Sequence, residues 1–144
     1  MITKPPLYKG EQIKELIPQR EPIIMIDAFY GCTATDGYTG FSVYPENIFC
    51  HKGFFSTPGL IEHIAQSASA FIGYMAITQS KPVRIGYIGE IKNYHKFYQP
   101  CIGNELRTVI HILSEVMGIT LISAETKVED RLAASCQMKI ALKK

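Results

Sequence analysis

The sequence predicts an α+β fold in which about six antiparallel strands wrap around one long central helix. Residues 56–73 open with Ser-Thr-Pro-Gly, and their apolar positions then recur with helical spacing. No charged residue lies between Gln66 and Gln79, and a helix that is apolar or small nearly all round belongs in a protein interior. Much of the second half of the chain instead alternates apolar and polar residues, as strands do. We expect one domain that spans residues 1–144.

Charge and hydropathy exclude several classes of protein. The net charge is only +2 at pH 7, and no basic run alternates with aromatic residues, which argues against a nucleic-acid partner. Residues 1–10 lack the apolar core of a secretory signal. The uncharged run 64–80 approaches membrane-span length, but its Ser, Gln and Gly content suits a protein interior. We therefore expect a cytoplasmic protein that does not insert into membranes.

The cysteines and histidines predict no metal or cofactor. No Cys-x-x-Cys pair occurs, no His, Cys, Asp and Glu spacing resembles a metal site, and no glycine-rich phosphate loop is present. Cys50 has no evident neighbouring base, so an incidental thiol is a simpler reading than a nucleophile. The four cysteines fit buried thiols of a reducing compartment: Cys32, Cys50, Cys101 and Cys136.

Two strands are expected before the central helix. Residues 8–19 are predicted to form a short amphipathic helix that Pro18 stops. Residues 22–30 are β-branched and aromatic and predict a strand, and residues 39–44 predict its partner. Residues 45–55 then form an irregular loop.

The central helix has clear start and stop signals. Thr57 is expected to cap its first free amides, and Pro58 suits the first helical position because its missing N–H costs nothing there. Lys81-Pro82 ends the helix. Four strands are expected to follow, over residues 83–97, 106–112, 120–126 and 132–142.

This layout predicts a dimer. One helix covers the inner face of about six strands, so the sheet must curl around it. A curled open sheet still has exposed edges, and pairing with a second copy hides one of them.

A polar stripe on the buried helix is the candidate for function. Glu62 is followed by Gln66, Ser69 and Gly73 at four, seven and eleven residues, which places all four on one side of the helix. Taken alone, Glu62 could equally have a structural role, because the helix dipole favours an acidic residue near a helix start.

Four segments in order resemble the hot-dog-fold 3-hydroxyacyl-acyl-carrier-protein dehydratases of fatty acid synthesis. Residues 16–27 resemble the family's opening Leu-Pro-His-Arg-Pro-Pro-hydrophobic-Asp segment, and Pro-Glu-Asn at 45–47 matches the segment before its active-site loop. Glu-His-Ile-Ala-Gln at 62–66 matches Glu-Ala-Met-Ala-Gln on the central helix, and Gly-Asn-Glu-Leu at 103–106 matches Gly-Asp-x-Leu. The resemblance covers nearly all of the chain and implies a hot-dog fold.

The chain departs from that family at the active-site loop. The family carries Gly-His-Phe-Pro with its histidine fourteen residues before the glutamate, where this chain has Ile48. His51 lies eleven residues before Glu62 and is the nearby alternative. A subgroup of aryl-polyene, pigment-type biosynthesis also keeps the helix glutamate without the standard histidine motif, and this chain is similar to it.

The resemblance implies removal of water from a 3-hydroxyacyl thioester. Such an elimination needs a base for the C2 proton and an acid for the leaving hydroxyl. The implied acid is Glu62 and the implied base is His51, which is otherwise a solvated loop residue; in the resembling enzymes the pair comes from two subunits. Gly59 would offer its amide to the thioester carbonyl and, without a side chain, leave it room. The remaining substrate-binding candidates are Gln66, Phe54, Phe55, Ile61 and Phe71.

Two other functions stay open on the same fold. A thioesterase would use Glu62 to activate water, and a non-catalytic subunit of a dehydratase complex would only bind substrate or carrier. The expected partners are acyl carrier protein or a coenzyme A thioester, together with a second copy or a related dehydratase subunit in a dimer or higher oligomer.

Five basic residues are candidates for a surface that receives an acidic carrier protein: Lys52, Lys81, Arg84, Lys92 and Lys96. His63, about 100° around the helix from Glu62, is expected to be structural, and His95 and His111 are expected to be structural or surface residues.

Overall fold

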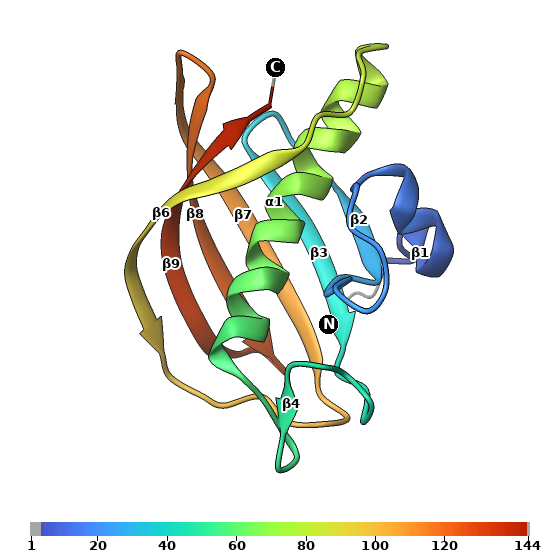
Figure 1. Ribbon diagram of the computed structural model, residues 1–144, viewed down its shortest axis with the longest axis vertical. Helices are drawn as coiled ribbons and strands as arrows, with labels where there is room; N and C mark the ends of the chain where they lie inside the picture. The colour runs from blue at the N-terminus through green and yellow to red at the C-terminus, as the bar shows by residue number, and fades with distance from the viewer. Residues whose placement is uncertain (1–3, 144) are drawn as a thin grey trace.

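A computed structural model describes residues 4–143 of the chain. One antiparallel sheet curves behind a single long helix, α1, and its last strand in the order of the sheet crosses in front of the upper part of that helix (Figure 1). This is the α+β architecture that the sequence predicts. No helix within the described residues is both long and apolar enough to cross a membrane.

Within residues 4–143 the main sheet has seven strands, one more than the six expected, in the order β1-β2-β3-β7-β8-β9-β6. A separate two-stranded hairpin, β4–β5, precedes α1. The strands of the main sheet are β1 (Tyr8–Lys9), β2 (Ala28–Cys32), β3 (Asp36–Ser42), β6 (Gly86–Lys96), β7 (Glu105–Val116), β8 (Ile119–Val128) and β9 (Arg131–Leu142), and those of the hairpin are β4 (Cys50–His51) and β5 (Phe54–Phe55).

The helix α1 runs over Thr57–Thr78, as its start and stop signals predict, with one correction at its first residue. Ser56, not Thr57, is the capping residue: its backbone is extended, and its Oγ accepts from the Gly59 amide at 3.4 Å. Thr57 is already helical, and Pro58 therefore occupies the second helical position. Its missing N–H costs nothing there either, because the first amides of a helix have no intrahelical partner.

Small residues allow α1 to lie close to the rest of the chain. A Cβ on Gly37 of β3 would stand 2.5 Å from the ring of Phe71, so the phenyl ring uses the space that this glycine leaves. A Cβ on Gly73 would collide with the backbone carbonyl oxygen of Leu16. Phe71 and Leu16 are completely buried, and both belong to the larger of two apolar clusters in the core.

The segment before β2 differs from the sequence prediction in two places. The predicted helix at 8–19 is a 3₁₀-helix over Gly10–Glu15, preceded by β1. Gly10 at φ +61° starts it and Pro18 follows closely, so the segment is too short to hold a stable α-helix. The predicted strand at 22–30 begins only at Ala28, for a reason that lies in the candidate site.

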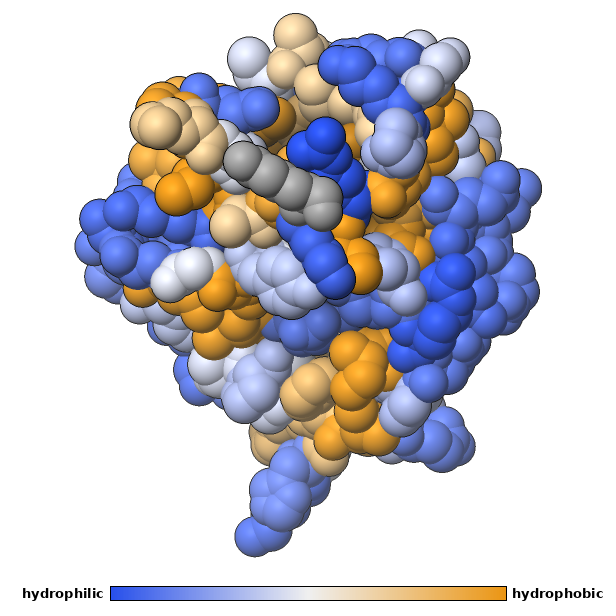
Figure 2. Space-filling view, turned by 45° about the horizontal axis from the view of Figure 1, so that its top comes forward, coloured by the Kyte–Doolittle hydropathy of each residue, from blue (hydrophilic) through white to orange (hydrophobic). Residues whose placement is uncertain are grey.

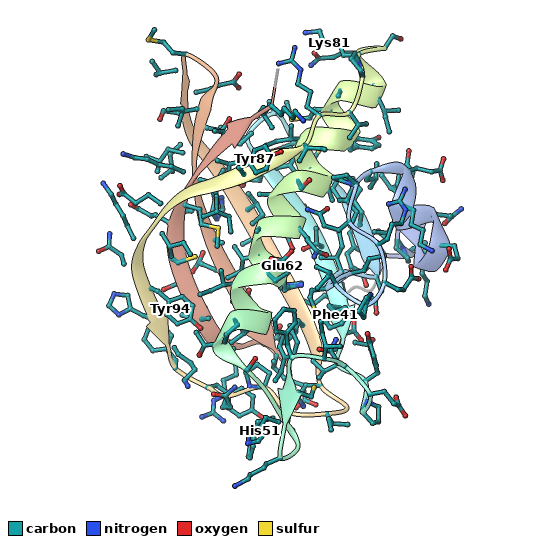
Figure 3. The ribbon with its side chains drawn as sticks, viewed as in Figure 1. Phe41, His51, Glu62, Lys81, Tyr87 and Tyr94 are labelled. Carbon is teal, nitrogen blue, oxygen red and sulfur yellow. The ribbon has the colours of Figure 1, made fainter. Side chains whose placement is uncertain are left out.

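The strand β6 forms one edge of the sheet and is almost entirely exposed. It pairs with β9 on one side only, and its apolar residues include Tyr87 (53% exposed), Ile88 and Ile91. Tyr87 lies where β6 crosses α1 (Figure 3). An edge strand of eleven residues that carries exposed apolar side chains is a template for pairing with another chain.

Candidate active site

Glu62 lies in the second turn of α1 and is half-buried. The amide of Gln66, one turn further on, donates to Glu62 Oε1 at 2.8 Å. Gln66 is completely buried, so this bond fixes one oxygen of the carboxyl group against a rigid partner. The neighbouring helix residues Ile61, Ala65 and Ser69 are half-buried and uncharged. Glu62 is therefore a positioned carboxyl group on an otherwise uncharged surface.

Gln66 also holds the segment that precedes β2. Its Nε2 donates to Ile23 O at 2.8 Å, and its Oε1 accepts from Met25 N at 2.6 Å. The Met25 carbonyl in turn accepts from the ring of His63 at 2.7 Å. These backbone groups are satisfied by side chains of α1 and not by a neighbouring strand, which is why residues 23–25 do not extend the sheet; Asp27 N already donates to Gly40 O of β3 at 3.0 Å. Gln66 thus holds both the Glu62 carboxyl group and the backbone of Ile23 and Met25. Its contact with substrate stays a prediction.

His63 is a structural residue, as expected. It is completely buried, and its Nδ1 must donate because the Met25 carbonyl can only accept. Its Nε2 then accepts from the Thr108 hydroxyl at 2.7 Å, and Thr108 lies 2.7 Å from the hydroxyl of Thr126. Burial lowers the pKa of His63 to about 4, so the ring is neutral at pH 7. Both nitrogens are occupied, which leaves none for a substrate.

Gly59 has a packing role that the sequence analysis missed. A Cβ at this position would stand 2.7 Å from Phe49 Cβ and from the ring of Phe55. The glycine therefore lets the start of the helix approach these two side chains. The space that its missing Cβ leaves is filled by Phe49 and Phe55, and not left open for a ligand as the sequence suggested. The contact between its amide and Ser56 Oγ, at 3.4 Å, is long for a hydrogen bond. The amide as donor to a thioester remains a proposal.

The four predicted lining residues fall into two groups. Phe55 and Phe71 are completely buried in the two core clusters, where their rings contact Gly59 and Gly37. Ile61 is half-buried beside Glu62, and Phe54 is 51% exposed on the hairpin. Of the four, only Ile61 and Phe54 therefore present apolar surface to a ligand in the single chain.

His51 is not brought to Glu62 within one chain. It is exposed on β4, opposite Phe54 of β5. The hairpin lies beyond the N-terminal end of α1, with His51 well apart from Glu62 (Figure 3). Phe55 N donates to Pro100 O at 2.8 Å and Ile102 N to Gly53 O at 3.0 Å, which ties the hairpin to the loop after β6.

The nucleophile reading of Cys50 finds no support. Burial raises the pKa of its thiol, and the Sγ atom lies 3.7 Å from the backbone carbonyl of Tyr44. A thiolate would be disfavoured in that position. Among the described residues, no three His, Cys, Asp or Glu side chains come together in a way that could hold a metal ion.

The five basic residues do not form one surface. Lys81 lies at the far end of α1 from the hairpin that carries His51 and Lys52 (Figure 3). Lys92 pairs with Glu90 at 3.1 Å on the edge strand. A single basic approach to Glu62 from all five is therefore excluded.

Tyr94 is a half-buried tyrosine near the start of α1 that the sequence pattern does not reveal. The register of β6 against β9 shifts between Lys92 and His95, and Asn93 has a φ of +53°. This irregularity turns Tyr94 inward from an exposed strand, as β-bulges often do. Burial raises its pKa, partly offset by the neighbouring hydroxyl of Thr57, yet its own hydroxyl has no hydrogen-bond partner within residues 4–143. Polar and apolar residues alternate poorly around a bulge, so no sequence signal marks it.

Comparisons with known proteins agree with this fold. The structure of the dehydratase heterocomplex ApeI:P from Xenorhabdus doucetiae is similar with a TM-score of 0.86 and 11% identity, over 99% of this chain and 93% of that chain. The conserved protein PA5202 from Pseudomonas aeruginosa is similar with a TM-score of 0.67 and 15% identity, over 90% and 98%. A hypothetical thioesterase with coenzyme A from Streptococcus pneumoniae TIGR4 has a TM-score of 0.64 and 6% identity, over 80% and 84%.

At these identities the solved structures show a shared hot-dog fold. No curated protein matches the sequence. The family of ApeP-like proteins, described as ApeP dehydratase, matches residues 11–143, which is nearly the whole chain. The chain therefore belongs to the ApeP-like dehydratase family.

Proposed function

We propose that this protein removes water from a 3-hydroxyacyl thioester, carried on acyl carrier protein or coenzyme A, to give the trans-2-enoyl thioester in fatty acid or polyene-type lipid synthesis. The observation that carries the proposal is the Glu62 carboxyl group, held by the buried amide of Gln66 on an uncharged, half-buried helix face. A dehydratase needs one such group, positioned to give a proton to a hydroxyl that is otherwise a poor leaving group.

The elimination balances with two side chains. A base takes the proton from C2, and the electrons of that C–H bond form the C2–C3 double bond. The bond between C3 and its oxygen breaks, and the oxygen leaves as water with a proton from Glu62. Charge that develops on the thioester oxygen would be met by amides at the start of α1, for which Gly59 is the proposed donor.

The base that acts with Glu62 would come from a second subunit: His51 of a second copy, or the equivalent base of a related dehydratase subunit, with His51 then serving the partner's acid. His51 lies apart from Glu62 in its own chain, and the face of α1 that carries Glu62 is only half covered. The exposed edge strand β6, with Tyr87, Ile88 and Ile91, offers a place for that subunit to pair. Because the similar Xenorhabdus doucetiae structure is a dehydratase heterocomplex, we propose a related dehydratase subunit as the partner, with a second copy as the alternative.

Two other activities are separable by experiment. The fold is shared with a hypothetical thioesterase, which would release free thiol. A non-catalytic subunit would turn over nothing alone, and the separation of His51 from Glu62 in one chain favours keeping this alternative.

The test follows both products at once. The protein, alone and with a related dehydratase subunit, is given a 3-hydroxyacyl carrier protein while enoyl absorbance and thiol release are recorded. We expect enoyl product, lost in Glu62→Gln and kept in the matched control Glu129→Gln, whose carboxyl group lies in an exposed turn. Thiol release without enoyl product would replace the proposal with a thioesterase. Enoyl product that persists in Glu62→Gln whenever the second subunit is present would assign this chain a non-catalytic role.

A further inference from the structure

A cavity of about 310 Å³ lies at the C-terminal end of α1, away from the candidate active site. The helix contributes Ile72, Met75 and Ala76, and strands β7 and β9 contribute Ile112 and Leu142. Glu62 is not among the lining residues, and ten residues of helix separate it from Ile72, which corresponds to about 15 Å. The volume is at the lower end of the range of small-molecule sites, roughly 300–1,000 Å³.

The cavity combines apolar walls with polar lining residues, Gln79, Glu115 and Thr120, and with two basic side chains. Lys81 and Arg84, from the exposed segment that connects α1 to β6, both line it. Among the described residues that line the cavity, Glu115 is the one carboxylate, and within residues 4–143 neither cation has a carboxylate oxygen within 4 Å. Figure 3 shows Lys81 at this end of the helix, and Figure 2, with the same end turned forward, shows hydrophobic surface interrupted by hydrophilic side chains.

Most of the last carbonyl groups of α1 are satisfied without the two cations. Three of the last four accept from backbone amides: Met75 O from Gln79 at 3.1 Å, Ile77 O from Ser80 at 3.0 Å and Ala76 O from Lys81 at 2.8 Å. Within residues 4–143, neither the Lys81 ammonium nor the Arg84 guanidinium has a carboxylate partner, so both are available to bind an anion beside the cavity.

We propose that this cavity binds a small amphiphile, with an alkyl body against Met75, Ile112 and Leu142 and an anionic head beside Lys81 and Arg84. A simple hydrated anion would gain nothing from the apolar walls, and a neutral hydrocarbon would gain nothing from the cations. A carboxylate or a phosphate ester on a short alkyl chain satisfies both. The site is separate from the chemistry of Glu62 and goes beyond the proposed activity.

The test uses octanoate, octyl phosphate and neutral octanol with protein labelled with ¹³C at the methionine methyl groups. Met75 lines the cavity, whereas Met25 lies beside Gln66 near Glu62, so the two methyl signals report on different sites. We expect saturable shifts at Met75 and not at Met25, with both anions binding at least tenfold more tightly than octanol. The tighter of the two anions identifies the head group.

Substitutions test the contribution of the two cations separately from that of the cavity volume. Lys81→Gln combined with Arg84→Gln changes two exposed residues and should weaken octanoate at least tenfold while octanol stays unchanged, and Ala76→Leu should weaken all three probes. The control Lys127→Gln removes a positive charge from an exposed position on β8 and should change nothing. Shifts confined to Met25, equal binding of the three probes, no saturable binding, or an unchanged affinity in the double variant would each overturn the proposal.

Discussion

Acidification should destabilise this protein through one buried histidine. His63 is completely buried, donates from Nδ1 to a backbone carbonyl and accepts at Nε2 from Thr108. A proton on Nε2 would replace that acceptor with a donor and place a charge in the core. The pKa of about 4 in the folded protein, against 6.5 for an unburied histidine, expresses this cost.

The sign and the size follow from those two values. Between pH 4 and pH 6.5 the unfolded chain binds a proton at this position and the folded protein does not, so the free energy of unfolding falls as the pH falls. The contribution is fully present above pH 6.5 and lost progressively below it. One pKa unit corresponds to about 1.4 kcal/mol, so the loss from pH 7 to pH 4 amounts to about 3 kcal/mol.

Urea unfolding at several pH values between 7 and 4 measures this loss. Asp27 changes stability in the opposite direction, because burial raises its pKa and its folded form takes up a proton more readily. The comparison is therefore with His63→Gln, which keeps Asp27 and removes the imidazole. We expect the pH-dependent loss in the variant to be smaller by about 3 kcal/mol. Equal losses in the two proteins, or an imidazole signal of His63 that titrates above pH 6 by NMR, would refute the reasoning.

Three further substitutions test the packing around the site. Gly73→Ala should destabilise by about 1–3 kcal/mol in urea unfolding, because the new methyl group meets the Leu16 carbonyl; an unchanged midpoint would contradict the close approach. Ser56→Ala should cost about 1 kcal/mol through loss of the helix cap, where Thr57→Ala should cost less. Gln66→Leu should lower dehydration at least tenfold and also lower stability, because it releases the buried Met25 amide, the part-buried Ile23 carbonyl and the proposed catalytic carboxyl group; full activity would remove its positioning role.

Much of the fold could be predicted because it depends on patterns that burial enforces. The uncharged face of residues 64–78 identified α1, and the alternation in residues 132–142 identified β9. Residues 22–27 have equally strand-like composition, but side chains from α1 occupy backbone groups of Ile23 and Met25. Such long-range competition for backbone partners leaves no local pattern.

The candidate site could be predicted only in part for the same reason. Glu62 can be singled out as a candidate because its spacing and its surrounding motif are local. The bond from Gln66 to Glu62 follows from a four-residue spacing, yet the second role of Gln66, holding Ile23 and Met25, spans some forty residues. The inward turn of Tyr94 depends on a bulge, and no periodic pattern reveals it.

The most direct test of the account is dehydration by the Glu62→Gln variant, assayed with the partner subunit that supports the wild-type chain. Glutamine keeps the size of the side chain and can still contact Gln66, but it has no proton to give to the leaving hydroxyl. We predict unchanged folding and an enoyl-forming rate reduced at least a hundredfold, within the range that general acid catalysis contributes. A folded Glu62→Gln variant that forms enoyl product at the wild-type rate would contradict the central claim.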